Sequence, residues 1–313
     1  MIKILLLGKN GQVGWELQRS LAPLGEVIEL DRHSTDFCGD ISQLDALAQT
    51  VRAIRPDVIV NAAAHTAVDK AESEPELART LNALAPEVLA REAANLGAWL
   101  VHYSTDYVFD GSGERPWVES DAPGPLSVYG RTKLEGETLV AQANPRHLIF
   151  RTSWVYAARG GNFAKTMLRL GQEREKLTVI NDQFGAPTGA DLIADVTAHA
   201  IRQAVCRIPA PTTARAPATA SDNCDLAGIY HLVASGCTNW FDYAKHVLAQ
   251  AEKAQGAIKI KAKEVLPVPT SAFPTPARRP HNSRLNTQKL QATFGLTLPP
   301  WQSGVNRMLA EIL

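Results

Sequence analysis

Short apolar runs alternate with amphipathic stretches along the first half of the chain. The runs predict strands at Ile2–Leu7, Val27–Leu30, Val58–Val60, Trp99–Tyr103 and His147–Thr152. Nearly continuous apolar strands are typical of parallel sheets that helices cover on both faces. The helical patterns between the strands favour repeated strand–helix–strand units. The pattern therefore predicts an α/β fold with a doubly wound parallel sheet.

The second half departs from this alternation. Amphipathic helices are predicted at 163–170, 191–201 and 240–254, and a strand at 229–233. We expect residues 1–153 to form a dinucleotide-binding domain. Residues 154–313 are expected to form mainly a smaller, interleaved substrate-binding domain, with some later segments returning to the first. The stretch 207–224 is rich in Pro, Ala and Thr, which predicts a flexible surface insertion.

Prolines mark two further features. Pro86 lies inside a helical pattern that runs from Leu77 to Leu96, so a break or kink is predicted there. The segment 267–280 is proline-rich and contains Arg278 and Arg279. We expect this segment to be extended and to close over an anionic ligand.

A glycine-rich turn follows the first predicted strand. It reads Gly8-Lys9-Asn10-Gly11-Gln12-Val13-Gly14 and leads into a helical pattern. Glycines in this position allow a tight turn and a close approach of the backbone to a pyrophosphate, which the helix N-terminus then attracts. Strand, turn and helix together predict the first half of a Rossmann-type dinucleotide site, with Gly-x-x-Gly-x-x-Gly spacing.

The next strands end in residues suited to the same cofactor. Asp31 follows the second strand, where a carboxylate accepts hydrogen bonds from an adenosine ribose and favours NADH. Arg32 is adjacent and tolerates the additional phosphate of NADPH, so both cofactors stay open. Asp40 is expected to cap the following helix, and Ile41 to cover the adenine. His65 follows the third strand in a loop, where a position beside the cofactor is favoured over a role as catalytic base.

A proton donor is predicted downstream. Tyr129 and Lys133 are four residues apart, which places both side chains on one face of a helix. A free phenol has a pKa of about 10, and a nearby ammonium lowers it. Thr105 follows the fourth predicted strand and adds a hydroxyl that orients a substrate oxygen. These three residues predict acid–base chemistry at a carbonyl group.

Composition and charge exclude several other functions. The chain has 313 residues, 32 basic and 32 acidic, so its formal net charge is zero and it has no overall field to attract nucleic acid or an anionic membrane. Its four cysteines form no Cys-x-x-Cys pair, which is typical of a reducing compartment. The first strand runs straight into the glycine turn rather than into a signal-peptide pattern. We expect a cytoplasmic protein that binds neither nucleic acid nor membrane.

With these residues placed, the chain resembles the extended short-chain dehydrogenase/reductase family. The resemblance extends almost from end to end, apart from the insertion. Its most specific segments are 8–16, 61–69, 102–109, 128–133, 151–156, 179–189 and 274–285.

The resemblance implies a role for individual residues. Tyr129 would be the proton donor, Lys133 would also contact the nicotinamide ribose, and Thr105, Asp106 and Trp154 would hold the substrate sugar. For Trp154, core packing is the alternative. The implied cofactor residues are Gly8, Gly11, Gln12, Val13, Asp31, Asp40, Ile41, Ala64, His65, Thr66, Tyr103, Tyr129 and Lys133.

The resemblance leaves metal binding and assembly open. Some members bind Mg²⁺ between two subunits through acidic residues, and others do not. Glu16, Asp191 and Asp195 fall at the matching positions, although Asp191 is shorter than the glutamate expected there. Carboxylate oxygens suit Mg²⁺. A homodimer is one expected form.

The activity implied is NAD(P)H-dependent reduction of the C4 ketone of a dTDP-linked 4-keto-6-deoxy sugar, for cell-surface polysaccharide such as lipopolysaccharide O-antigen. A dehydratase of the family would have a glutamate where this chain has Tyr107. An epimerase needs the same tyrosine and lysine and stays an alternative. A non-catalytic NAD(P)-binding regulatory subunit is the third, although it has no need of all three of Thr105, Tyr129 and Lys133.

Overall fold

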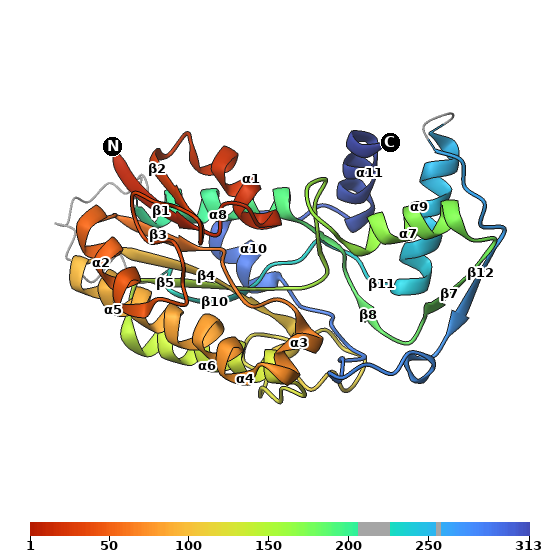
Figure 1. Cartoon of the computed structure of the whole chain (residues 1–313), viewed down its shortest axis with the longest axis horizontal. Helices are drawn as coiled ribbons and strands as arrows, with labels where there is room; N and C mark the ends of the chain where they lie inside the picture. The colour runs from red at the N-terminus through yellow and green to blue at the C-terminus, as the bar shows by residue number, and fades with distance from the viewer. Residues whose placement is uncertain (206–225, 255–257) are drawn as a thin grey trace.

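A computed structural model describes residues 1–205, 226–254 and 258–313, and the predicted insertion at 207–224 lies outside them. The larger part of the molecule is a six-stranded sheet with the order β10-β5-β4-β3-β1-β2 (Figure 1). Every neighbouring pair in this sheet is parallel. The predicted α/β class is confirmed.

The strands of this sheet lie close to their predicted positions. The bounds are β1 Ile2–Leu7, β2 Gly25–Leu30, β3 Val58–Asn61, β4 Trp99–Thr105, β5 His147–Thr152 and β10 Gly228–His231. Because β4 is two residues longer than predicted, Ser104 and Thr105 belong to the strand itself. Asp106 then begins a short 3₁₀ helix, η2, at Asp106–Val108.

Helices cover both faces of the sheet (Figure 1). One core cluster joins the sheet to the helices α1 Gln12–Leu21, α8 Ala190–Val205 and α10 Gln288–Phe294. A second cluster on the other face joins it to α2 Leu44–Ile54, α5 Ala85–Leu96 and α6 Val128–Ala143. Burial on both faces explains why the central strands are apolar throughout. Because β10, α8 and α10 come from the second half of the chain, the two parts are interleaved in sequence.

The smaller part packs around its own apolar cluster beside the C-terminal ends of the strands (Figure 1). Its helices are α7 Phe163–Glu173, α9 Trp240–Lys253 and α11 Trp301–Ile312. Three short strand pairs complete it: β6 Val155–Tyr156 with β9 Thr188–Gly189, β8 Phe184–Gly185 with β11 Thr238–Asn239, and β7 Lys176–Ile180 with β12 Glu264–Val268. A 3₁₀ turn, η4, follows at Thr270–Ala272.

The helical pattern from Leu77 to Leu96 is irregular next to Pro86, close to the predicted position. Three helical segments follow one another: α3 Val68–Ser73, α4 Pro75–Arg79 and a π-helical turn, η1 Thr80–Leu84, which leads directly into α5. Pro86 lies in the first turn of α5, and because η1 continues directly into this helix, its missing N–H removes a hydrogen bond to the preceding turn. The irregularity lies just upstream, in the π turn.

Asp40 does not cap α2 as predicted. That helix begins at Leu44 with Gln43 as its N-cap residue. The Asp40 carboxylate instead accepts hydrogen bonds from the backbone N–H and the hydroxyl of Ser42, at 2.9 and 2.7 Å. It therefore closes the turn before the helix. No helix within the described ranges combines the length and hydropathy that crossing a bilayer requires.

Candidate active site

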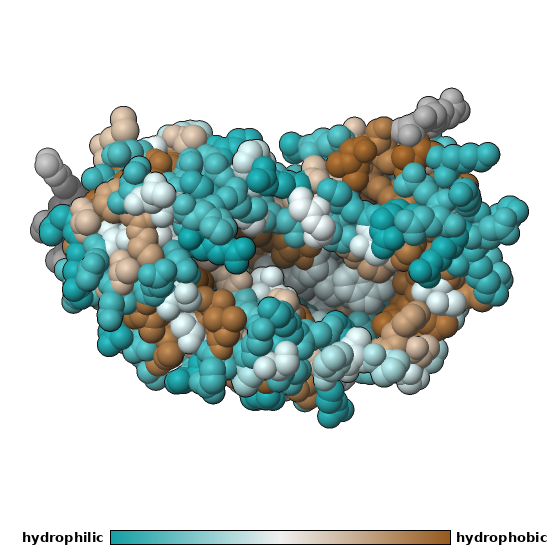
Figure 2. Space-filling model, viewed as in Figure 1, coloured by the Kyte–Doolittle hydropathy of each residue, from teal (hydrophilic) through white to brown (hydrophobic). Residues whose placement is uncertain are grey.

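A cavity of about 930 Å³ lies between the two parts of the molecule, at the C-terminal ends of the central strands. Figure 2 shows the molecule hollowed there. The chain passes from β1 to β2 on one side and returns to β3 on the other, so the strand order reverses beside β1. In open parallel sheets ligands bind at such a point. The cavity is large enough for a dinucleotide with a second ligand beside it.

The glycine turn forms one end of this cavity. Gly8 has a φ of +85°, and a Cβ atom there would lie 2.8 Å from the backbone nitrogen of Ala63, after β3. A Cβ on Gly14 would lie 2.0 Å from the Gly8 carbonyl oxygen. Both positions therefore require glycine, because the strand ends and α1 approach so closely. Gly11 is the N-cap residue of α1 and contributes no side chain, so the N–H groups of the first turn face the cavity mouth.

The adenosine end is polar and already organised. The Asp31 carboxylate accepts a hydrogen bond from the backbone N–H of His33 at 2.9 Å and another from the side chain of Asn10. Burial acts to raise its pKa, but these bonds outweigh it and hold the pKa below the usual value. Asp31 is thus a charged acceptor beside the cavity. Ile41 is 6% exposed and lines the same region, as expected of a residue that packs on an adenine.

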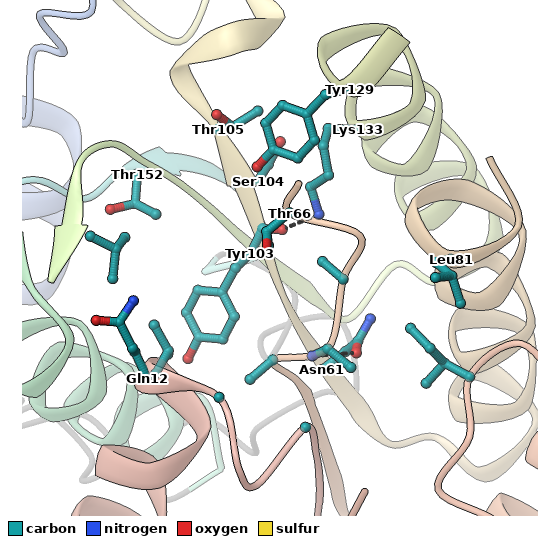
Figure 3. Close-up of a pocket in the computed structure, with 18 of the residues that line it drawn as sticks. Gln12, Asn61, Thr66, Leu81, Tyr103, Ser104, Thr105, Tyr129, Lys133 and Thr152 are labelled. Atoms are coloured by element: carbon teal, nitrogen blue, oxygen red, sulfur yellow. Dashed lines mark hydrogen bonds between the residues drawn. The ribbon is translucent and has the colours of Figure 1, made fainter. Parts of the chain in front are cut away.

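Tyr129, Lys133 and Thr105 come together at the end of β4 (Figure 3). Ser127 caps α6 through its hydroxyl, which accepts the N–H of Gly130 at 3.1 Å and so fixes the first turn that carries Tyr129. Tyr107 lies edge-on to Tyr129, with ring centroids 5.5 Å apart. Three residues from two elements thus share one wall of the cavity.

The acid–base behaviour of this group follows from its burial. Desolvation raises the pKa of Tyr129 to about 12, and the Thr105 hydroxyl acts in the opposite direction as a hydrogen-bond partner. Desolvation lowers the pKa of Lys133 to about 8, while nearby Glu137 acts to raise it. The expected lowering of the Tyr129 pKa by Lys133 is not found. The reason is that Lys133 Nζ donates to the Tyr103 carbonyl oxygen, at 2.5 Å, instead of facing the phenol.

A buried carboxyl group and a pair of tryptophans also line the cavity. Asp106 is 2% exposed, and desolvation raises its pKa to about 6. Its Oδ1 accepts a hydrogen bond from Thr105 at 3.0 Å, whereas its Oδ2 has no partner within the described residues. Trp154 has a φ of +50° and stacks on Trp240 with ring centroids 3.6 Å apart. Both indoles line the cavity, so Trp154 forms a pocket wall rather than part of a closed core.

Several lining residues were missed by the sequence analysis. Ser104, Thr152 and Ser153 are buried, and their hydroxyls have no hydrogen-bond partner within the described residues. They lie at or just beyond the C-terminal ends of β4 and β5, and all three residues line the cavity. Trp240 was also missed, because only the tertiary fold brings the start of α9 to this wall. The first three were detectable as polar residues at the ends of predicted parallel strands.

His65 is the one predicted cofactor residue that does not line the cavity, although Ala64 and Thr66 on either side do. The Asn82 side chain accepts the backbone N–H of His65 at 2.9 Å and donates to its carbonyl at 3.1 Å. The imidazole lies 3.6 Å from Glu74, away from the cavity. His65 therefore shapes the loop through its backbone, and its ring is not placed to act as a base.

The predicted metal ligands Glu16, Asp191 and Asp195 lie on α1 and α8, which pack against each other. Asp195 forms an ion pair with Arg19 at 2.9 Å and accepts the Ser20 hydroxyl at 2.6 Å. Asp191 lies 3.8 Å from Arg307. Among the described residues, no group of three or more His, Cys, Asp or Glu side chains is arranged to hold a metal ion. Arg19 also lies 3.7 Å from Glu16, whose pKa is raised by desolvation and by the nearby Asp191. Binding of Mg²⁺ between two subunits stays a prediction.

Comparison with known proteins agrees with this geometry. Residues 2–313 match the family model described as RmlD substrate binding domain. A protein of Escherichia coli strain K12 named dTDP-4-dehydrorhamnose reductase is 60% identical, and the alignment covers 99% of this chain and 98% of that protein. A relative of the same name from Burkholderia thailandensis is 45% identical, with 100% and 99% covered.

Solved structures give the same result. A dTDP-4-dehydrorhamnose reductase from Bacillus anthracis, in complex with NADP, superposes with a TM-score of 0.84 at 33% identity and 99% coverage of both chains. A UDP-glucose 4-epimerase from Thermus thermophilus, with NAD, has a TM-score of 0.76 but only 20% identity, which shows the fold alone. The chain therefore belongs to the RmlD substrate-binding domain family.

Proposed function

We propose that this protein reduces the C4 ketone of dTDP-4-dehydro-6-deoxy-L-mannose to give dTDP-L-rhamnose, with NADH or NADPH as the reductant. The observation that carries the proposal is the meeting of Tyr129, Lys133 and Thr105 at one wall of a cavity that also contains the glycine turn. The shared name of the close relatives supports this choice of substrate.

The cavity fits the cofactor. Gly8 and Gly14 let the ends of β1 and β3 and the start of α1 pack closely, because a Cβ at either position would meet the protein backbone. The free N–H groups of α1 suit a pyrophosphate, and Asp31 suits a ribose hydroxyl. Ser104, Thr152 and Ser153 provide unsatisfied hydroxyls nearer to Tyr129. The dihydronicotinamide ring, when bound, supplies the hydride.

The chain's own residues then handle the proton and the developing charge. Tyr129 stays protonated at neutral pH because its pKa is raised to about 12, so it is a competent donor to an alkoxide oxygen. Thr105 stabilises that oxygen by a hydrogen bond. Lys133 lines the same cavity, and its buried ammonium is placed to donate a hydrogen bond to the cofactor rather than to the phenol. Asp106 accepts a sugar hydroxyl through its free Oδ2, and Trp154 packs against the sugar ring.

An epimerase on the same scaffold is the second candidate, because it uses the same tyrosine and lysine. A dehydratase is disfavoured because Tyr107 occupies the position of the extra acid, and desolvation raises the pKa of its phenol rather than activating it. The epimerase would retain NAD and consume no reduced cofactor over a cycle.

The deciding experiment follows absorbance at the nicotinamide band with dTDP-4-keto-L-rhamnose and NADH or NADPH. We expect stoichiometric oxidation of the cofactor and formation of dTDP-L-rhamnose. Parallel assays with and without EDTA test whether a divalent cation takes part. Protein that carries tightly bound NAD and consumes no NAD(P)H would instead be an epimerase.

Tyr129→Phe tests the proton donor. We expect kcat to fall by about 10²–10⁴-fold, because general acid catalysis is worth that much, while NADH affinity changes little. Tyr107→Phe is a matched control, since its ring contacts Tyr129 but its phenol has no assigned role. Unchanged turnover in Tyr129→Phe would remove Tyr129 from the mechanism.

A further inference from the structure

A buried imidazole lies directly beside the catalytic lysine. His102 is in β4, 1% exposed, and its Nε2 lies 3.1 Å from Lys133 Nζ. The other contact of Nζ is the Tyr103 carbonyl oxygen at 2.5 Å, drawn as a dashed line in Figure 3. Neither contact was anticipated from the sequence, where His102 is simply one residue of an apolar strand.

The two contacts determine where the ammonium points. A lysine ammonium has three N–H donors and no acceptor. Within the described residues Nζ has two hydrogen-bond partners, both on β4, and these account for two of its donors. Lys133 itself lines the cavity, so the remaining donor is available to a ligand there. A ribose hydroxyl of the cofactor is the chemistry that matches such a donor.

The second ring nitrogen of His102 faces Asn61, at the end of β3. Asn61 Nδ2 lies 3.2 Å from His102 Nδ1. When Nε2 accepts from a charged lysine, the ring proton must be on Nδ1, because a neutral imidazole has one donor and one acceptor. A half-turn of the Asn61 amide presents its oxygen to that proton, and it gives up the hydrogen bond that this oxygen accepts from the Ala63 N–H at 3.2 Å. Polar contacts on both edges thus hold the ring in its plane between the strand and the lysine.

We propose that His102 is a positioning residue for Lys133, which accepts one ammonium N–H, keeps the buried amine charged and aims its free N–H into the cofactor cavity. His102 does not touch the reacting atoms. Its contribution to catalysis passes through Lys133, so this inference rests on the proposed reductase mechanism.

The charges around Lys133 agree with this role. Burial lowers the pKa of Lys133, and Glu137, one turn further along α6, raises it. The Glu137 carboxylate is itself engaged by Arg151 of β5, at 2.9 and 2.6 Å, so its charge is shared. From β4, desolvation and the neighbouring Lys133 lower the pKa of His102 well below its usual value, which keeps the imidazole neutral as an acceptor.

Two variants of His102 test the proposal. His102→Leu fills the space but removes the acceptor, whereas a glutamine oxygen in His102→Gln reaches the position of Nε2. In His102→Leu we expect the alkaline limb of the kcat–pH profile to move down by about one to two pH units. The reason is that loss of a hydrogen bond to the charged ammonium lowers the pKa of Lys133 by about that amount. Activity should recover towards pH 6.5, and His102→Gln should restore most of the wild-type profile.

His231→Leu is the matched control. His231 is equally buried, lies at the end of β10 and does not line the cavity. Its substitution should lower thermal stability without moving the pH profile. A second readout, NADH affinity followed by nicotinamide fluorescence between pH 6.5 and 9, does not depend on turnover. His102→Leu should bind NADH more weakly at pH 9 than at pH 6.5, with a larger ratio than the wild type shows.

An unshifted pH profile in His102→Leu would overturn the proposal. So would an equal loss at every pH in both His102 variants, because that pattern indicates a packing defect. If the wild-type protein does not reduce the ketone but its NADH affinity shows the expected pH dependence, the proposed function fails while the role of His102 stands.

Discussion

In the proposed reaction Tyr129 protonates the oxygen that becomes negatively charged when hydride reaches the ketone, and burial determines the acid–base behaviour of this phenol. Because the pKa of the phenol is raised to about 12, it does not ionise over the working pH range. The pKa of Lys133, at about 8, is the one that falls inside that range. The lysine rather than the tyrosine should therefore set the alkaline limit of activity.

Asp106 should set the acid limit. Its pKa is raised to about 6, so below that pH the carboxyl becomes neutral and loses its strength as an acceptor for a sugar hydroxyl. We expect the kcat/KM of the wild type for the sugar nucleotide to fall as pH drops through 6. Asp106→Asn should lower kcat/KM by about 10–100-fold at pH 7.5 and remove this acid limb. Persistence of the limb in Asp106→Asn would assign it to another group.

The raised pKa of Asp106 also affects protein stability, which should fall as pH rises, whereas activity should rise with pH. A carboxyl whose pKa is raised by folding binds its proton more tightly in the folded state, so its contribution to stability is lost as pH rises from the unfolded value through about 6. Asp106→Asn should therefore gain thermal stability relative to the wild type at pH 7.5 and lose that gain at pH 4. Melting curves at the two pH values measure the difference.

At the scale of elements, the turn between β1 and α1 is where sequence and geometry agree most closely. The three glycines serve different contacts: Gly8 faces the end of β3, Gly11 begins the helix and Gly14 lets α1 pack on Gly8. A backbone anion site needs all three features at once.

Gly14→Ala should disrupt this turn. Its Cβ would lie 2.0 Å from the Gly8 carbonyl oxygen, so the backbone must shift. We expect NADH binding to be lost in titrations, and the free energy of unfolding to fall by about 1–3 kcal/mol, as for other overpacked sites. Gly161→Ala is the control, because nothing lies within 4 Å of its Cβ. Normal NADH affinity in Gly14→Ala would mean that the turn can relax.

The π turn between α4 and α5 was not predicted from the sequence, although it supports the site. It carries Asn82, which is fully buried and holds both backbone groups of His65 and the hydroxyl of Thr132. A Cβ on Gly136 would lie 2.1 Å from the Asn82 carbonyl oxygen, so α6 packs closely against this turn. The turn thereby links the loop after β3 to the helix that carries Lys133.

At the scale of the whole molecule, the cavity is completed by the smaller part. Trp240, at the start of α9, stacks on Trp154, and its Nε1 donates to Gln183 at 3.0 Å. Arg279, from the segment predicted to close over an anion, forms an ion pair with Asp69 of α3 at 2.7 Å. The ion pair of Arg279 with Asp69 joins this late segment of the chain to the larger part.

Trp240→Ala tests the contribution of the smaller part. Loss of the stack frees Trp154 from its support, and we expect KM for the sugar nucleotide to rise by about 2–10-fold, in line with the energy of an aromatic pair. NADH affinity should not change. Phe273→Ala, an aromatic that is 43% exposed and does not line the cavity, is the control. An equal change in NADH affinity would show that Trp240 acts on the whole cavity instead.

The sequence by itself determined the parallel sheet, the glycine turn and the Tyr129–Lys133 pair, because each depends on local periodicity or spacing. Apolar strands and an i, i+4 helix spacing carry their structural meaning within a few residues. The same local signals did not reveal the π turn just before Pro86. They also placed the N-cap of α2 at Asp40, whereas the helix begins after Gln43. Only the tertiary structure decided which way each side chain points.

The tertiary structure turned His65 away from the cavity, placed Trp240 against Trp154 and brought His102 to Lys133. It also set the protonation of the site, because the pKa values of Tyr129, Lys133 and Asp106 are shifted mainly by desolvation. Desolvation depends on atoms contributed by distant parts of the chain, so it has no signature in residue spacing.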